Sequence, residues 1–225
     1  MRIINLLWTG GWDSTFRLLY LLLVERKLVQ PYYIIDTKRE STPVEIKTMR
    51  RIREKIFEKF PRAKELLAEI IFKNRNDIKE NKKFAKMQKE LSKKNRIGTQ
   101  YVWLASFSEQ EKIDELELCV DGYAPGVVNS VLKPEVVGEG HECRLADKVK
   151  NKNVELFRLF RFPLVVDYWK GKAGDFSRRQ GVDDIMELTW FCHHPKDGKP
   201  CRKCYPCEQV KKAGLEYRFE MRAPD

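Results

Sequence analysis

The residues best suited to chemistry stand near the two ends of the chain. Close to the N-terminus an apolar run leads into two glycines, an aspartate and three hydroxyl residues, in the order Thr9-Gly10-Gly11-Trp12-Asp13-Ser14-Thr15. Glycines let a backbone approach an anion closely, and a helix N-terminus offers unpaired N–H groups with partial positive charge. We therefore expect a phosphate group here, with donors from Ser14 and Thr15 and a Mg²⁺ ligand in Asp13. A plain turn between a strand and a helix would show the same pattern.

Four of the six cysteines crowd into a short segment near the C-terminus, with the spacing C-x8-C-x2-C-x2-C. Short loops of this kind bring four thiolates around one tetrahedral Zn²⁺, and the lysines and the arginine nearby offset their negative charge. The x2 spacing also occurs in iron–sulfur proteins, but their usual further cysteine followed by proline is missing here. His193 and His194 are either alternative ligands or loop residues beside the site. The expected zinc ligands are Cys192, Cys201, Cys204 and Cys207.

The N-terminal segment resembles the PP-loop of the ATP pyrophosphatases, usually Ser-Gly-Gly-x-Asp-Ser, with Thr9 in place of the first serine. It lacks the Gly-Lys-Ser/Thr of a Walker loop and the third glycine of the dinucleotide fingerprint. Together with the cysteine spacing after Thr189-Trp190, it resembles the 7-cyano-7-deazaguanine synthase family of queuosine precursor synthesis. Two other segments are similar to that family: Glu142-Cys143-Arg144, where it has Asp-Cys-Arg, and Pro163-Leu164 with the lysines that follow.

This resemblance implies an ATP-dependent ligase that converts 7-carboxy-7-deazaguanine to the nitrile. The carboxylate would be adenylated with release of pyrophosphate, ammonia would displace AMP, and a second ATP would activate the amide oxygen. Mg²⁺ would accompany ATP, and the zinc would be structural. The implied ATP-binding residues are Trp8, Thr9, Gly10, Gly11, Trp12, Asp13, Ser14, Thr15 and Asp36. The implied catalytic residues are Asp13, Ser14, Arg144, Lys170 and Lys172, and the substrate contacts are Glu142, Cys143 and Arg144.

Departures from the family pattern leave the product and the acceptor open. The residues from Asp36 to Arg39 stand where the family often has Tyr-Gly-Gln, and Glu142 stands where it has Asp. A relative can stop at the amide, or pass the activated base to an amine of a protein or a nucleic acid. A tRNA-modifying PP-loop enzyme would use Cys119 or Cys143 for sulfur chemistry, although Cys119 lies within an apolar strand pattern. A non-catalytic interaction module that holds zinc is the blandest alternative.

Strand and helix patterns alternate at the spacing of βα units, which favours an α/β fold with a doubly wound parallel sheet, as in PP-loop proteins. Asp36 ends the second expected strand, where such sheets bind ligands, or it caps a turn there. We expect one domain over residues 1–225, with the zinc-binding segment at about 189–210. Strands are expected at 2–8, 29–35, 68–72, 116–120 and 154–166, and helices at 14–24, 44–60, 77–94, 98–111 and 173–180.

The net charge of +11 is concentrated in one part of the chain. Residues 38–96 hold 20 Lys/Arg and 9 Asp/Glu, which gives +11, whereas the remainder holds 24 of each. This region is either a basic face for a nucleic-acid or protein acceptor, or a pair of helices with solvated lysines. The longest uninterrupted apolar run, from Leu18 to Val24, is too short to span a bilayer, so we expect no membrane contact. Because no signal-peptide layout is present, we expect a cytoplasmic protein. We also expect the protein to form a homodimer.

Overall fold

A single seven-stranded sheet forms the centre of the protein, with the strand order β3-β2-β1-β4-β7-β6-β5. The computed structural model describes residues 2–94, 97–120, 127–166 and 170–222. The five strands from β3 to β7 in that order pair in parallel, whereas β6 pairs antiparallel with both β7 and β5. The bounds are β1 Ile3–Leu7, β2 Leu28–Ile35, β3 Ile71–Asn74, β4 Leu116–Glu117, β5 Val136–Val137, β6 Arg144–Leu145 and β7 Phe160–Arg161.

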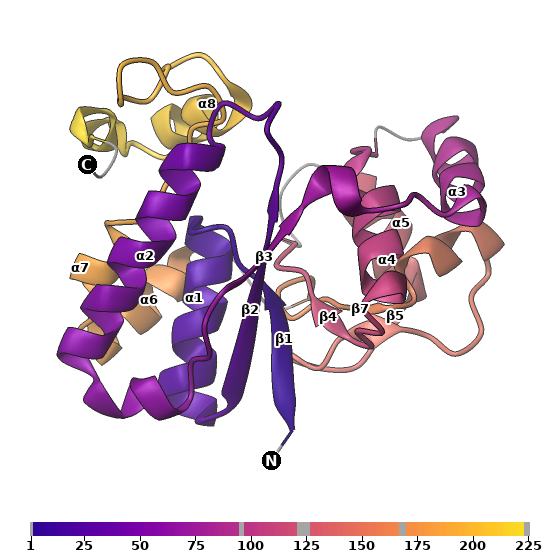
Figure 1. Ribbon diagram of the computed structural model, residues 1–225, viewed down its shortest axis with the longest axis horizontal. Coiled ribbons are helices and arrows are strands. Elements are labelled where there is room, and N and C mark those ends of the chain that lie inside the picture. The colour runs from indigo at the N-terminus through magenta and orange to yellow at the C-terminus, as the bar shows by residue number, and fades with distance from the viewer. Residues whose placement is uncertain (1, 95–96, 121–126, 167–169, 223–225) are drawn as a thin grey trace.

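Helices flank the sheet on both sides, as Figure 1 shows. One side carries α1 (Trp12–Tyr20), α2 (Thr42–Lys59), α6 (Lys170–Gln180) and α7 (Asp183–Met186), and α8 (Tyr205–Lys212) lies beyond one end of α2. The other side carries α3 (Lys82–Ser92), α4 (Gln100–Gln110) and α5 (Val127–Leu132). A π-helical turn, η1 (Leu21–Glu25), prolongs α1. The 3₁₀ turns are η2 Pro61–Glu65, η3 Arg75–Asp77, η4 Lys133–Glu135, η5 Lys152–Phe157 and η6 Glu216–Glu220.

Strand β1, the middle one of the five strands that pair in parallel, supplies apolar side chains to both faces of the sheet. Leu6 belongs to the buried cluster shared with α1, α2 and α7, whereas Leu7 packs against the cluster formed by α3, α4 and η5. Successive side chains of a strand point to opposite faces, so an unbroken apolar run suits a strand that is covered on both sides. A strand in this position holds the residues that follow it at the middle of one edge of the sheet.

A buried ion-paired network joins α1 to the neighbouring strand β4. Arg17 of α1 is 1% exposed and donates from Nε and Nη2 to the two carboxylate oxygens of Glu117, at 2.8 and 2.7 Å. Its Nη1 donates to Glu25 at 2.5 Å. Burial alone lowers the pKa of Arg17, but the hydrogen bonds and charges of Glu117 and Glu25 raise it overall, so the guanidinium stays charged. The network fixes the helix that begins at the glycine turn against the sheet.

Four expected elements differ clearly from the structure, and one of them is the fourth strand, which is expected at 116–120 but spans only Leu116–Glu117. The third strand is not at 68–72 but at Ile71–Asn74, and the basic helix expected at 77–94 spans only Lys82–Ser92, capped by the Asn81 side chain on Lys83 N at 2.8 Å. The fifth strand expected at 154–166 is wrong over most of its length. Residues Lys152–Phe157 form the 3₁₀ turn η5, and only Phe160–Arg161 pair as a strand. The apolar run is buried in a turn, and burial by itself does not distinguish a turn from a strand.

The basic region of the sequence is divided between the two sides of the sheet. It includes α2, which lies beside α1, and α3, which lies on the opposite side beside α4 (Figure 1). The excess positive charge is therefore divided between helices on opposite sides of the sheet. On α3 the side chains of Lys82, Lys83, Lys86 and Lys89 are exposed while Phe84 and Leu91 are buried, which is the arrangement of a solvated amphipathic helix.

Candidate functional site

The glycine turn between β1 and α1 is tightly packed against α2. Gly10 has a φ of +68°, in the left-handed region that favours glycine. A Cβ atom at this position would lie 3.1 Å from Met49 Cγ and 3.2 Å from Thr48 Cγ2. Both the backbone conformation and the space therefore call for glycine, and the turn brings the chain sharply from the strand into the helix.

The hydroxyl residues of the turn hold its shape. Ser14 Oγ donates to the carbonyl of Gly11 at 3.4 Å and accepts from Thr9 N at 3.4 Å. Trp8 Nε1 donates to Thr15 Oγ1 at 3.1 Å, and both of these side chains are fully buried. Gly11 is the N-cap of α1 and has no side chain to cap the helix, so the first N–H groups of α1 open toward the turn.

A cleft of about 630 Å³ opens beside this turn. It lies at the carboxyl ends of β1, β2 and β4, where the strand order reverses between β1 and β4, and the start of α4 forms a further wall. In open α/β sheets, ligands bind at such a reversal point. The described residues that line the cleft are Leu7, Thr9, Gly11, Trp12, Asp13, Ser14, Tyr33, Ile34, Asp36, Arg39, Thr99, Gln100, Tyr101, Trp103, Leu104, Leu118, Cys119, Val120 and His193.

The cleft contains six of the nine expected nucleotide-binding residues, namely Thr9, Gly11, Trp12, Asp13, Ser14 and Asp36. The other three lie behind its wall, since Trp8 and Thr15 bond to each other in the core and Gly10 faces α2. Asp36 also makes a local turn, because its Oδ1 accepts from Lys38 N at 2.9 Å. Asp36 therefore lines the cleft and also stabilises the turn that follows β2.

The segment expected to contact the substrate does not line the cleft in the described part of the chain. Cys143 is fully buried in the core, with its thiol 3.4 Å from the carbonyl oxygen of Gly140. Arg144 lies on β6, three strands from β1, where its Nη1 donates to Asp147 at 2.6 Å. Glu142 is exposed beside them. Lys172 is exposed on α6, and Lys170 begins that helix with a side chain outside the described part of the structure.

Cys119 lines the cleft just after the end of β4 and is half-buried. Burial raises the pKa of this thiol well above its usual value, and the negative charges of Glu117 and Asp13 raise it further. A thiol that holds its proton is a poor nucleophile. The cysteine in the cleft is therefore suited to packing rather than to sulfur transfer.

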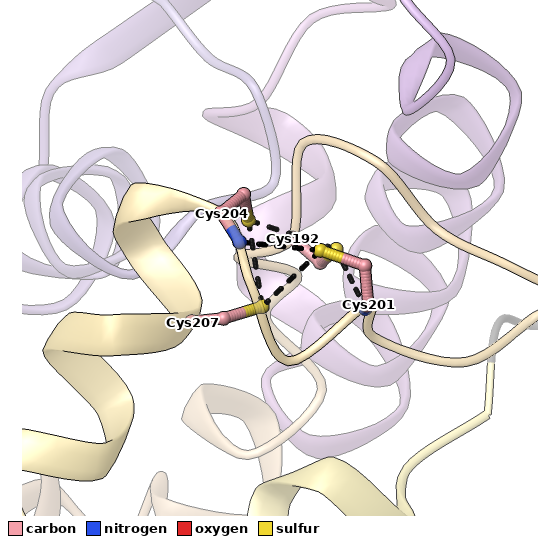
Figure 2. A group of neighbouring side chains, drawn as sticks. All are labelled: Cys192, Cys201, Cys204 and Cys207. Carbon is pink, nitrogen blue, oxygen red and sulfur yellow. Dashed lines mark hydrogen bonds between the residues drawn. The ribbon is translucent and has the colours of Figure 1, made fainter.

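The four expected metal ligands converge, as Figure 2 shows. Their sulfur atoms all lie within 4.8 Å of one another. The separations are 3.9 Å from Cys201 to Cys207, 3.9 Å from Cys204 to Cys192 and 3.4 Å from Cys204 to Cys207. Four sulfurs at about 2.3 Å from one tetrahedral ion would be about 3.8 Å apart. The cluster can therefore hold a single metal ion such as zinc.

Backbone N–H groups around the cluster favour thiolates. Cys201 N donates to Cys192 Sγ at 3.1 Å, and Cys204 N donates to Cys201 Sγ at 3.3 Å. Burial raises the pKa of Cys201, but hydrogen bonds from the backbone of Lys203 and Cys204 outweigh it and lower the pKa to about 6. Burial raises the pKa of Cys192 to about 11. Four crowded sulfurs cannot all ionise unless a cation compensates their charge, which is the condition that a metal ion meets.

The cysteine segment is bonded directly to the glycine turn. Trp190 N donates to the carbonyl of Gly10 at 3.0 Å, and the Trp190 indole donates to Cys192 O at 2.7 Å. Arg218 of η6, which is 5% exposed, donates to Thr189 O at 2.6 Å and lies over the ring of Trp12. The metal ligands and the turn are thus two hydrogen bonds apart, although about 180 residues separate them in the sequence.

Several cleft residues could not be identified from local patterns. The start of α4 and its N-cap contribute Thr99, Gln100, Tyr101, Trp103 and Leu104, and no motif precedes that helix. Leu118 to Val120 directly follow β4, the strand next to β1, and the rule that ligands gather at strand ends could have identified them. Arg39 appeared in the sequence only as a departure from a family pattern.

No protein-family model matches this chain, and no curated protein matches it either. In the part of the chain that the structure describes, no helix is both long and apolar enough to cross a membrane. A proposal about function therefore depends on the chemistry of the cleft and the cysteine cluster.

Proposed function

We propose that this protein is a metal-bearing, ATP-dependent carbon–nitrogen ligase similar to 7-cyano-7-deazaguanine synthase. The observation that carries the proposal is the turn from Thr9 to Ser14, which follows β1 and opens into a cleft at the reversal point of the sheet. A glycine turn leading into a helix suits a triphosphate, and the two carboxylates of Asp13 and Asp36 line the same cleft. The four-cysteine cluster beside the turn supports the same resemblance, with zinc as its metal.

The proposed reaction begins with attack of the substrate carboxylate on the α-phosphorus of ATP. Pyrophosphate leaves, and the acyl adenylate that remains has a good leaving group where the carboxylate had none. Ammonia displaces AMP to give the amide. The amide oxygen then attacks the α-phosphorus of a second ATP with release of a second pyrophosphate, and loss of AMP and a proton leaves the nitrile. The chain's part is to hold the reactants in line and to balance their charge.

The residues of the turn have separate parts in this scheme. The N–H groups at the start of α1 and the hydroxyls of Thr9 and Ser14 bind phosphate oxygens. Asp13 and Asp36 are suited to hold Mg²⁺, which would neutralise the charge of the phosphates. The aromatic side chains of Trp12, Tyr101 and Trp103 offer flat apolar surfaces to the purine-like rings of ATP and the substrate.

The described residues of the cleft say less about the acceptor of the activated base than about the nucleotide. Because the segment from Glu142 to Arg144 lies outside the cleft, no described residue of the expected substrate set distinguishes the free base from a larger acceptor. A relative that stops at the amide, or that joins the base to an amine of a protein or a nucleic acid, is the second candidate. A tRNA-modifying sulfur transferase is less well supported, because Cys143 is buried in the core and Cys119 holds its proton.

Mass spectrometry of the deazaguanine base and of the nucleotide tests the proposal. The zinc-loaded protein is incubated with ATP, Mg²⁺, 7-carboxy-7-deazaguanine and ammonium, and the masses of the base and of the nucleotide are followed together. A nitrile with AMP supports the synthase-like function. An amide, or a base added to protein or nucleic acid, moves the function to the second candidate. An unchanged base with unchanged ATP contradicts both.

A further inference from the structure

Arg39 is the only lysine or arginine among the described residues that line the cleft. Asp13 and Asp36 line the same cleft, so its described side chains carry more acidic than basic charge. ATP and a carboxylate substrate would both bring further negative charge. The lysines and arginine that the family resemblance implies do not supply a described cation here, since Arg144 and Lys172 lie elsewhere. The cleft therefore depends on Arg39 for a protein cation.

A built network holds this guanidinium in place. Arg39 Nη2 lies 2.7 Å from Glu45 Oε1, and Arg39 Nε donates to Ser41 Oγ at 2.8 Å. Glu45 is 4% exposed and also accepts from Tyr33 and Ser41, each at 2.8 Å. Burial raises the pKa of Tyr33, and the charge of Glu45 raises it further, so the phenol keeps the proton that it donates. Every oxygen of the buried carboxylate thus has a donor.

The network leaves one end of the guanidinium available to a ligand. A guanidinium carries five N–H donors, and the contacts with Glu45 and Ser41 use Nη2 and Nε. For Nη1 of Arg39 the structure shows no hydrogen-bond acceptor among residues 2–94, 97–120, 127–166 and 170–222. The Arg39 side chain is 42% exposed, in contrast to its buried carboxylate partner. A cation held from one side and open on the other is suited to bind an anion.

The network also lies next to the glycine turn. A Cβ atom at Gly10 would be 3.5 Å from the carbonyl oxygen of Glu45, so the first turns of α2 pack on the phosphate-binding segment. Tyr33, which donates to Glu45, lines the cleft together with Arg39 and Ser14. Arg39 and the glycine turn follow the neighbouring strands β2 and β1, and both line the same cleft.

We infer that Arg39 binds an anionic group in the cleft, either the phosphates of the nucleotide or the carboxylate of the substrate, and that Glu45 positions it. This inference rests on the proposed function for the identity of the two anions. Arginine suits both, because its planar donors match the oxygens of a phosphate or a carboxylate. The alternative is that Arg39 only neutralises the buried charge of Glu45.

Calorimetric titration of the metal-loaded protein tests the role of Arg39. The probes are Mg²⁺ with α,β-methylene-ATP, inorganic pyrophosphate, 7-carboxy-7-deazaguanine and its uncharged 7-amide. Replacement of one charged hydrogen-bonding group predicts about 10- to 100-fold weaker binding for Arg39→Met. Loss of affinity for pyrophosphate and the ATP analogue assigns Arg39 to the phosphates. Loss for the carboxylate, with the amide unchanged, assigns it to the substrate. Unchanged affinity for every probe that the wild type binds overturns the inference.

Two further variants separate ligand binding from stability. Arg158→Met is the matched control, because Arg158 also pairs with a carboxylate, Glu155 at 2.6 Å, but does not line the cleft. It should leave all affinities unchanged. The double variant Arg39→Met with Glu45→Gln removes both charges of the network, so it should keep the fold. It should still bind weakly each probe whose affinity Arg39→Met lowers. Recovery of wild-type affinity in that double variant would assign Arg39 a purely structural role and overturn the inference. A wild type that binds none of the probes would instead refute the proposed function, and the inference with it.

Discussion

Replacement of Gly10 by alanine tests whether the glycine turn is built as the structure shows. A left-handed conformation costs an alanine about 1–2 kcal/mol. The new methyl group would also press on Met49 Cγ at 3.1 Å and Thr48 Cγ2 at 3.2 Å, and overpacking of this kind costs about 1–3 kcal/mol. Gly10→Ala should therefore lower the free energy of unfolding by about 2–5 kcal/mol, as the sum of the two terms. The displaced turn should weaken binding of Mg²⁺ with α,β-methylene-ATP at least tenfold.

Gly181→Ala is the matched control for this experiment. Gly181 has a φ of +63°, close to that of Gly10, but no heavy atom lies within 4 Å of the position of its Cβ. This variant should lose only about 1–2 kcal/mol, the cost of the backbone conformation, and should bind the nucleotide normally. Urea denaturation followed by circular dichroism gives both stabilities, and calorimetry gives both affinities. Equal losses of stability, together with normal nucleotide binding by Gly10→Ala, would refute the reasoning about the turn.

Three more predictions concern the supports of the cleft. Arg17→Met should cost about 3–5 kcal/mol because it leaves Glu117 buried without its main partner, and adding Glu117→Leu should recover part of that loss in urea midpoints; no recovery would contradict the pairing. Removing the metal with a chelator that is then washed out should weaken nucleotide binding about 2- to 10-fold, through loss of the Trp190–Gly10 hydrogen bond, and zinc should restore it. Burial lowers the pKa of His141, so the folded state binds its proton less readily than the unfolded state, and stability should fall as pH drops below about 6.5. His141→Leu should reduce that pH dependence without abolishing it, because burial also lowers the pKa of His193 to about 4; an unchanged slope would exclude a contribution from His141.

Local patterns predicted the parts of the site that are close together in the sequence. The glycine turn could be predicted because two glycines, an apolar run before them and an apolar run after them fall within about 20 residues. The cysteine cluster could be predicted because short spacings alone restrict four sulfurs to a small volume. In both cases the chain itself brings the groups together, and the rest of the fold has little freedom to separate them.

Contacts between distant segments could not be predicted in this way. The hydrogen bond from Trp190 N to Gly10 O joins segments near the two ends of the chain, and no residue type in either segment predicts it. Helix α4, which lies on the other side of the sheet from α1, forms one wall of the cleft. The prediction of a strand at 154–166 was wrong for a related reason. An apolar run indicates that a segment is buried, but it does not indicate whether the backbone is a strand or a turn. The segment from Glu142 to Arg144 came from a resemblance, and the structure leaves it outside the cleft.

The identity of the nucleotide product shows whether the glycine turn binds ATP for adenylation. The zinc-loaded protein is incubated with Mg²⁺, ATP and 7-carboxy-7-deazaguanine, and the products are separated by ion-exchange chromatography beside those of two variants. We predict AMP and pyrophosphate from the wild type and none from Asp13→Ala. The control Asp175→Ala should give the same products as the wild type, because Asp175 is a half-buried residue on α6 that pairs with Arg178. ADP and phosphate in place of AMP, or AMP release that survives Asp13→Ala, would contradict the claim that this turn binds ATP for adenylation.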